Sequence, residues 1–248
     1  MIVKNTIFID TTDSTNLEAW RRIKEGNFAE GTVIWTSHQK AGKGAGSNKW
    51  ESEEKMNLAA SYILKPDFID ADQQFYLNKC VSLAVRDCIS ELCKNKFEVY
   101  IKWPNDIIIA DKKIAGILIE NAIIGNTYST AVCGIGVNIN QEKFPPHLSN
   151  AISLKNITGK TRSLKICLET LSDYVLLWYK RLQLSDFETI DKTYLEYLYL
   201  KNVASKFKTD NKSFTGKIIG VSAYGNLLVE TIPGKISEFG FKEIVFPI

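Results

Sequence analysis

The chain has 248 residues, of which 45% are hydrophobic and 24% charged, a composition typical of one large globular domain with or without a small appendage. Its net charge of +3 is too small to indicate a nucleic-acid or membrane partner. Five cysteines without a Cys-x-x-Cys pair and two separated histidines argue against a disulfide framework, a zinc site or a histidine-based triad. There is no signal-peptide pattern and no apolar run that could span a bilayer, so we expect a cytoplasmic protein.

Four consecutive small polar residues precede the first predicted helix. Residues 7–9 form a predicted strand, and residues 16–25 form a helix that ends at Gly26. Between them lies Asp13-Ser14-Thr15-Asn16, of which helix capping needs one side chain. The others predict a polar ligand site at the start of this helix.

A glycine-rich run, residues 39–52, separates predicted strands at 31–37 and 56–64. Gly44 follows Gly42-Lys43 where a Walker A loop needs Ser or Thr, and Ser47 occupies the place of the third glycine of a dinucleotide fingerprint. Backbone N–H groups of such a loop can hold a phosphate or carboxylate, and Lys43 adds positive charge. A plain flexible hairpin loop is the alternative interpretation.

The middle of the chain combines a packing helix with a forced bend. Apolar residues recur at helical spacing over 73–94, which predicts a core helix. A strand then runs from residue 98 into Lys102-Trp103-Pro104-Asn105-Asp106, and Pro104 forces a bend before the next strand. Lys102 is either a surface charge or a functional group at this bend.

The remaining pattern predicts further strands, two helices and a small β-unit. A turn at 111–113 leads to a strand over 114–120 that contains Gly116, and Gly125-Asn126 predicts a hairpin turn. The next strand leads to Gly134-Ile135-Gly136-Val137-Asn138, where glycines allow close backbone approach. Helices are predicted over 164–182 and 186–200, and short strands after about residue 204 predict an SH3-like β-barrel.

Five segments in this order resemble biotin protein ligases, also called biotin–[acetyl-CoA-carboxylase] ligases. They are residues 13–16, the Gly42 loop ending at Trp50, residues 102–106, residues 113–120 and residues 134–140. The pair Lys-Trp-Pro-Asn-Asp and Lys-Ile-Ala-Gly-Ile-Leu is the most specific part, and the resemblance covers about residues 8–154. It implies an α+β fold with a mixed sheet flanked by helices, like class II synthetases. The implied domains are a biotin- and ATP-binding catalytic domain over 1–203 and a C-terminal SH3-like β-domain over 204–248.

The resemblance also implies a two-step reaction. Biotin and ATP with Mg²⁺ would give biotinoyl-5′-AMP and pyrophosphate, and the adenylate would then acylate a lysine of a biotin carboxyl carrier protein. Lys102 would be the central catalytic lysine, and Asp106 would lie near the metal and the phosphates. The implied ligand-binding residues are Ser14, Thr15, Asn16, Gln39, Gly42, Lys43, Gly44, Trp50, Asn105, Lys113, Gly116 and Asn138.

The glycine-rich loop departs from the usual family pattern. Lys43 stands where the family usually has its first arginine, Ala45 and Gly46 occupy the middle, and Ser47 replaces a later glycine. Lysine keeps the charge but lacks the planar fork of arginine, so we expect the loop to retain the adenylate less firmly than an arginine-rich loop.

Other readings remain open at this point. A lipoate–protein ligase would use a related fold and the same adenylation logic, and a non-catalytic biotin- or nucleotide-binding module would keep the pocket without Lys102. A plain structural α/β domain with glycine turns is the least favoured alternative. The catalytic pattern begins near residue 7, which predicts no N-terminal DNA-binding domain, and either a monomer or a homodimer is compatible with the sequence.

Overall fold

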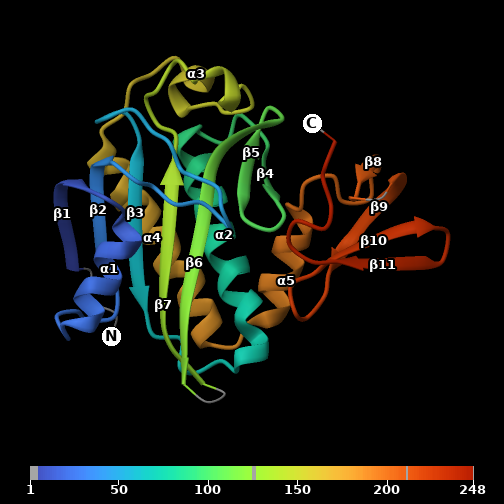
Figure 1. The fold of residues 1–248 in the computed structure, drawn as a ribbon, viewed down its shortest axis with the longest axis horizontal. Helices are drawn as coiled ribbons and strands as arrows, with labels where there is room; N and C mark the ends of the chain where they lie inside the picture. The colour runs from blue at the N-terminus through green and yellow to red at the C-terminus, as the bar shows by residue number, and fades with distance from the viewer. Residues whose placement is uncertain (1–4, 125–126, 211, 248) are drawn as a thin grey trace.

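A seven-stranded sheet forms the centre of the larger part of the molecule (Figure 1). The computed structural model describes residues 5–124, 127–210 and 212–247. Across the sheet the strands are β1 (Asn5–Thr12), β2 (Thr32–Gln39), β3 (Leu58–Leu64), β7 (Thr127–Val137), β6 (Lys112–Ile124), β5 (Asp106–Ile109) and β4 (Val99–Lys102). Among the described strand pairs of this sheet, only β1 and β2 are parallel, so the sheet is mixed, as predicted.

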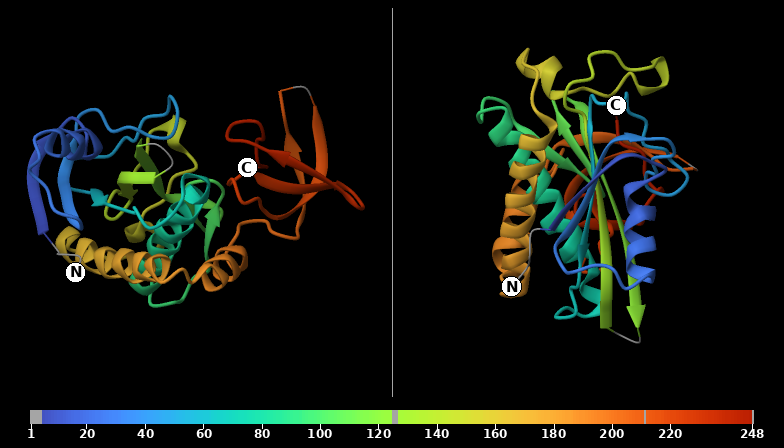
Figure 2. Two further views of the ribbon diagram at one scale, coloured as in Figure 1. Left: turned by 90° about the horizontal axis from the view of Figure 1, so that it is seen from below. Right: turned by 90° about the vertical axis from the view of Figure 1, so that its left-hand side faces the viewer.

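Helices cover the two faces of this sheet unequally (Figure 2). One face packs against α2 (Gln74–Leu92) and α4 (Leu164–Gln183), and α5 (Phe187–Glu196) packs against these two helices. On the other face lies α1 (Thr15–Lys24), over β2, β3 and β7. The short α3 (Leu154–Thr158) and two 3₁₀ turns, Ala71–Gln73 and Pro146–Leu148, complete the helical structure of the described residues.

The side chains of β3 point alternately to the two faces of the sheet. One face forms the main core, and the other carries α1 and a cavity. In β3, Leu58, Ala60, Tyr62 and Leu64 pack into the core beneath α2 and α4. Because successive side chains of a strand point to opposite faces, Ala59 and Ser61 lie on the α1 face. Ala59 lines a cavity on this face, whereas Ser61 is buried beneath the start of α1.

The C-terminal residues form a separate antiparallel sheet of four strands. Its order is β11 (Lys235–Phe239), β10 (Leu227–Ile232), β9 (Ser213–Val221) and β8 (Ala204–Lys208). The indole Nε1 of Trp103 donates to the carbonyl oxygen of Gly225 at 2.8 Å and so joins this unit to the β4–β5 turn. The four-stranded sheet agrees with the predicted β-unit, whereas the barrel closure and the boundary at residue 204 stay predictions.

Some element boundaries differ from the sequence-based expectation. The predicted turn at 111–113 lies at Ala110 and Asp111, both with positive φ, so Lys112 and Lys113 already belong to β6. The predicted hairpin turn at Gly125-Asn126 lies outside the described residues. No helix in the described part of the chain is long and apolar enough to cross a membrane.

Candidate active site

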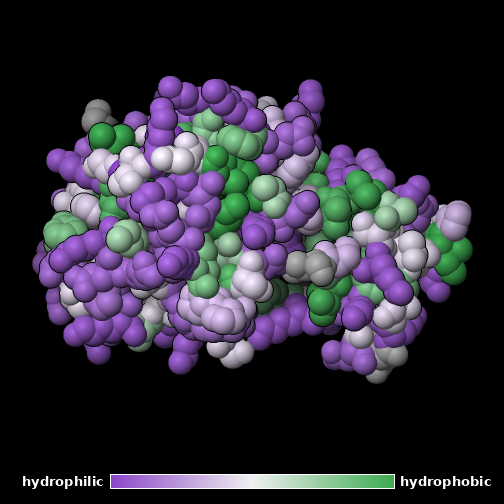
Figure 3. Space-filling view, turned by 90° about the horizontal axis from the view of Figure 1, so that it is seen from above, coloured by the Kyte–Doolittle hydropathy of each residue, from purple (hydrophilic) through white to green (hydrophobic). Residues whose placement is uncertain are grey.

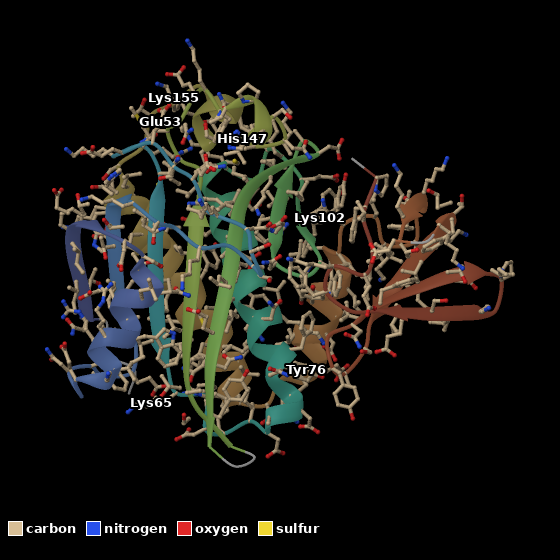
Figure 4. All side chains as sticks on the ribbon, viewed as in Figure 1. Glu53, Lys65, Tyr76, Lys102, His147 and Lys155 are labelled. Carbon is tan, nitrogen blue, oxygen red and sulfur yellow. The ribbon has the colours of Figure 1, made fainter. Side chains whose placement is uncertain are left out.

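A cavity of about 360 Å³ opens on the α1 face of the sheet, beside the C-terminal unit. Its walls come from the start of α1, the glycine-rich loop, the β4–β5 turn, strands β6 and β7, and the segment 241–246. Lys102 lies at this junction between the large sheet and the C-terminal unit (Figure 4). Seen from above, apolar residues gather in the middle of the molecular surface with polar residues around them (Figure 3).

Small residues on adjacent strands form the cavity floor. Ala59, Gly136 and Gly116 lie side by side on β3, β7 and β6. The Trp50 ring packs on this row so closely that a Cβ on Gly136 would overlap it, and a Cβ on Gly116 would be 3.1 Å from it. The buried Nε1 of Trp50 has no hydrogen-bond partner in the described part of the chain. The glycines therefore hold an indole inside the cavity with its donor unused.

The start of α1 brings several polar side chains to one end of the cavity. Ser14 is the N-cap residue, but its side chain makes no capping hydrogen bond, and its N–H donates to Asp13 Oδ1 at 2.7 Å. The N–H of Thr15 donates to Gln39 Oε1 at 2.8 Å, which fixes the Gln39 amide beside the helix. Ser14, Thr15, Asn16 and Gln39 all line the cavity.

Two lysines and an aspartate lie together at the β4–β5 turn. Lys102 and Asp106 are paired residues of β4 and β5, and Lys113 Nζ lies 2.6 Å from Asp106 Oδ1. Burial lowers the pKa of Lys102; the positive charge of Lys113 adds to this effect, and Asp106 opposes it. Asn105 is held against β6, because its Nδ2 donates to the Ile117 carbonyl oxygen at 2.8 Å.

The glycine-rich loop folds as a hairpin that meets the C-terminal unit. The N–H of Gly44 donates to the Asn48 carbonyl oxygen at 2.8 Å, and the N–H of Trp50 donates to the Gly42 carbonyl oxygen at 2.9 Å. At the hairpin tip, Lys242 Nζ lies 3.4 Å from Ser47 Oγ. In the same C-terminal segment, Phe246 places its ring centre 5.2 Å from Lys102 Nζ.

The charges around the cavity are strongly unbalanced. Among the described residues that line it, five are lysines and one is a carboxylate: Lys43, Lys49, Lys102, Lys113, Lys242 and Asp106. The carboxylate is already paired with Lys113. Such a cavity favours a ligand with several negative charges, since a fixed cation attracts an anion more strongly where water is excluded.

Most of the predicted site residues meet at this cavity. All of them line it except Gly42 and Asn138. Gly42 supports the hairpin, while Asn138 is buried and its Nδ2 donates to the Ile152 carbonyl oxygen at 3.1 Å. Asn138 therefore contacts the polypeptide rather than the cavity, and its predicted role in ligand binding stays a prediction.

Sequence reasoning missed part of the site. It did not single out Ser61, a hydroxyl in an otherwise apolar buried strand, or Glu120 within β6. It also missed the segment from Phe241 to Phe246. A buried serine in an apolar strand was a usable signal, but the contribution of the C-terminal segment depends on how the two sheets are arranged.

The predicted magnesium ligand is Asp106. The described residues contain no group of three or more His, Cys, Asp or Glu side chains that could form a metal cage. Asp106 Oδ1 is paired with Lys113, so this residue fits only an ion that is held mainly by phosphate and water.

Residues 8–138 match the biotin/lipoate A/B protein ligase family. The bifunctional ligase/repressor BirA of Bacillus subtilis is 32% identical over 239 residues, which are 93% of this chain and 71% of that protein. The biotin–[acetyl-CoA-carboxylase] ligase of Paracoccus denitrificans is 28% identical over 74% of this chain and 77% of its own length.

A solved structure extends the similarity to almost the whole chain. The biotin protein ligase of Aquifex aeolicus, in complex with biotin and ATP, superposes with a TM-score of 0.80 at 27% identity and covers 99% of both chains. The family match spans more than half of this chain, and the Bacillus relative is covered over more than two thirds of its length. The chain therefore belongs to the biotin/lipoate A/B protein ligase family, and it is a ligase enzyme.

Proposed function

We propose that the protein is an ATP-dependent biotin protein ligase that forms biotinoyl-5′-AMP and transfers biotin to a lysine of a biotin carboxyl carrier protein. The single observation that carries this proposal is the cavity lined by five lysines and one carboxylate, with uncharged polar groups at its α1 end. Relatives named as biotin ligases, and the similar structure with biotin and ATP, support the same substrates.

The first step joins two anions. A carboxylate oxygen of biotin attacks the α-phosphorus of ATP, a new P–O bond forms, and the bond to pyrophosphate breaks. The lysines at the β4–β5 turn would reduce the repulsion between these groups and stabilise the charge of the transition state. Lys102 is paired with Asp106 across β4 and β5, and Lys113 forms an ion pair with the same carboxylate, so both lysines are candidates for the central role. Mg²⁺, held by Asp106 and the phosphates, would neutralise the pyrophosphate.

The second step transfers the acyl group. The neutral amine of the carrier lysine attacks the carbonyl carbon of the adenylate, the carbonyl–phosphate bond breaks, AMP leaves, and the amine loses a proton. Water would compete with this amine. The hairpin that holds Trp50 over the floor at Gly116 and Gly136 would limit access of water to the adenylate.

Pyrophosphate release tests the proposal. The assay compares biotin with lipoate, each with ATP and Mg²⁺, in the wild-type protein and in the Lys102→Ala and Lys113→Ala variants. We expect biotin-dependent release that falls at least about 100-fold in each variant, as for loss of a group that stabilises transition-state charge. Lys235→Ala, an exposed lysine of the C-terminal unit, is the control. Release with lipoate alone would indicate a lipoate ligase, and biotin binding without release would indicate a binding module.

A further inference from the structure

Ser61 lies beneath the start of α1 and contacts two cavity residues at once. It is fully buried on β3, and its Oγ lies 2.7 Å from Thr15 Oγ1 and 2.6 Å from Asn16 Oδ1. A buried hydroxyl in an apolar strand costs free energy unless it is hydrogen bonded, so these contacts explain how the serine is tolerated there. They also connect the sheet directly to the polar end of the cavity.

The amide orientation of Asn16 is determined by its neighbours. Its Nδ2 donates to Glu120 Oε2 at 2.9 Å and to the Leu118 carbonyl oxygen at 3.3 Å. Both partners are acceptors, so exchanging the positions of Oδ1 and Nδ2 would bring oxygen against oxygen. Gly134 leaves space for this amide, because a Cβ there would overlap Asn16 Oδ1. Asn16 is therefore committed to protein contacts although it lines the cavity.

Counting protons fixes the direction of the remaining hydrogen bonds. Asn16 Oδ1 can only accept a hydrogen bond, so the single hydroxyl proton of Ser61 is donated to Asn16 Oδ1. The 2.7 Å contact between Ser61 and Thr15 then requires the proton of Thr15. Thr15 Oγ1 and Gln39 Oε1, which lie 3.1 Å apart, have no proton left between them. Gln39 Oε1 already accepts the Thr15 N–H but retains a second lone pair.

We propose that Glu120, Asn16 and Ser61 are positioning residues that hold the Thr15 hydroxyl and the Gln39 carbonyl as a pair of acceptors for an N–H group of the substrate. This inference rests on the proposed function and adds a basis for specificity. A cyclic urea such as that of biotin supplies an N–H donor. The dithiolane ring of lipoate has none, so the free lone pairs of Thr15 Oγ1 and Gln39 Oε1 would have no donor beside it, which disfavours its binding.

Biotin binding, measured by calorimetry on the whole chain, tests the relay from Ser61 to Thr15. We expect Ser61→Ala to weaken binding about tenfold, the effect of one hydrogen bond, and to raise KM for biotin with little change in kcat. Since Ser61 acts through Thr15, the Ser61→Ala/Thr15→Val double variant should bind within about twofold of Thr15→Val alone. Ser172→Ala is the matched control: it removes another buried serine hydroxyl, bonded to Tyr62 and Leu168 on the opposite side of the sheet.

Each outcome has a distinct meaning. Unchanged binding in Ser61→Ala, or additive losses in the double variant, would overturn the positioning role while leaving the ligase function intact. Absence of biotin binding in the wild-type protein would remove the proposed function and this inference with it. A loss in Ser172→Ala equal to that in Ser61→Ala would show a general effect of buried serines and would also overturn the inference.

Glu120 provides a second test through a conservative variant. Glu120→Gln keeps an acceptor oxygen for Asn16 Nδ2, so biotin binding should stay within about twofold of wild type, while Glu120→Ala should weaken it several-fold. Equal losses in the two variants would mean that the carboxylate does not act as an acceptor for Asn16, and the relay would be wrong at this residue.

Discussion

Lys102 combines burial with a position between the two units of the protein. Burial lowers its pKa from the ordinary lysine value of 10.5, so the ammonium loses its proton at a lower pH than an exposed lysine does. If the charged form is needed for adenylation, the rate of pyrophosphate release should fall as the pH rises through this lowered pKa. Lys102→Arg should retain some activity and lose this alkaline decline, because arginine stays charged.

The comparison is a pH–rate profile at saturating biotin and ATP. Lys235→Arg, at an exposed site in the C-terminal unit, controls for a general effect of the substitution on the protein. An unchanged alkaline decline in Lys102→Arg would contradict the prediction, since the titrating group would then lie elsewhere.

At the level of single residues, the sequence identifies site residues where a proline forces a bend or where polar residues precede a helix. Lys102, Asn105 and Asp106 are recognisable because Pro104 interrupts a strand pattern. Ser14 and Thr15 are recognisable because capping cannot use every polar residue before α1. The relay from Glu120 to Ser61 was not predictable, because it joins β6, β3 and α1, and only the strand order brings these together.

At the level of whole elements, Gly116 of β6 and Gly136 of β7 let the glycine-rich hairpin pack on these two strands through Trp50. A methyl group on Gly136 would overlap the Trp50 ring, so Gly136→Ala must displace the tryptophan or the hairpin. We expect kcat/KM for biotin-dependent pyrophosphate release to fall at least about tenfold, with a small change in Tm because the floor borders a cavity.

A strand glycine outside the site gives a matched control. A Cβ on Gly220 in β9 would lie 3.7 Å from the Leu195 side chain, an ordinary contact, so Gly220→Ala should keep its activity. If Gly136→Ala were as active as Gly220→Ala, the position of Trp50 on the floor would not matter for the reaction.

The sequence predicted the presence of the helices and strands better than it predicted their boundaries or the order of the strands in the sheet. Alternation and helical spacing predicted the strands and the long helices α1, α2 and α4. The predicted turn before β6 begins one residue late and ends two residues late, because Ala110 adopts positive φ although alanine carries no sequence signal for that conformation. The five-residue α3 was not predicted, since it is too short to show a helical period.

For the whole molecule, net charge is a poor guide to the site. The total of +3 predicts no polyanionic partner, yet five lysines and one paired carboxylate line a single cavity. The fifth lysine, Lys242, comes from the C-terminal unit and reaches the hairpin tip at Ser47. The two sheets thus build one site, and the sequence could not predict this because their contact depends on the docking of Trp103 against Gly225.

If Lys242 and the hairpin tip at Ser47 bind nucleotide phosphates, Lys242→Gln should raise KM for ATP several-fold and leave kcat and KM for biotin nearly unchanged. The dependence of KM for ATP on ionic strength should also weaken, since one charge of the cavity is lost. Lys235→Gln removes an equal charge from the same unit at an exposed site away from the cavity. If both variants raised KM for ATP equally, Lys242 would act only through net charge. A selective effect of Lys242→Gln would mean that the C-terminal unit takes part in nucleotide binding.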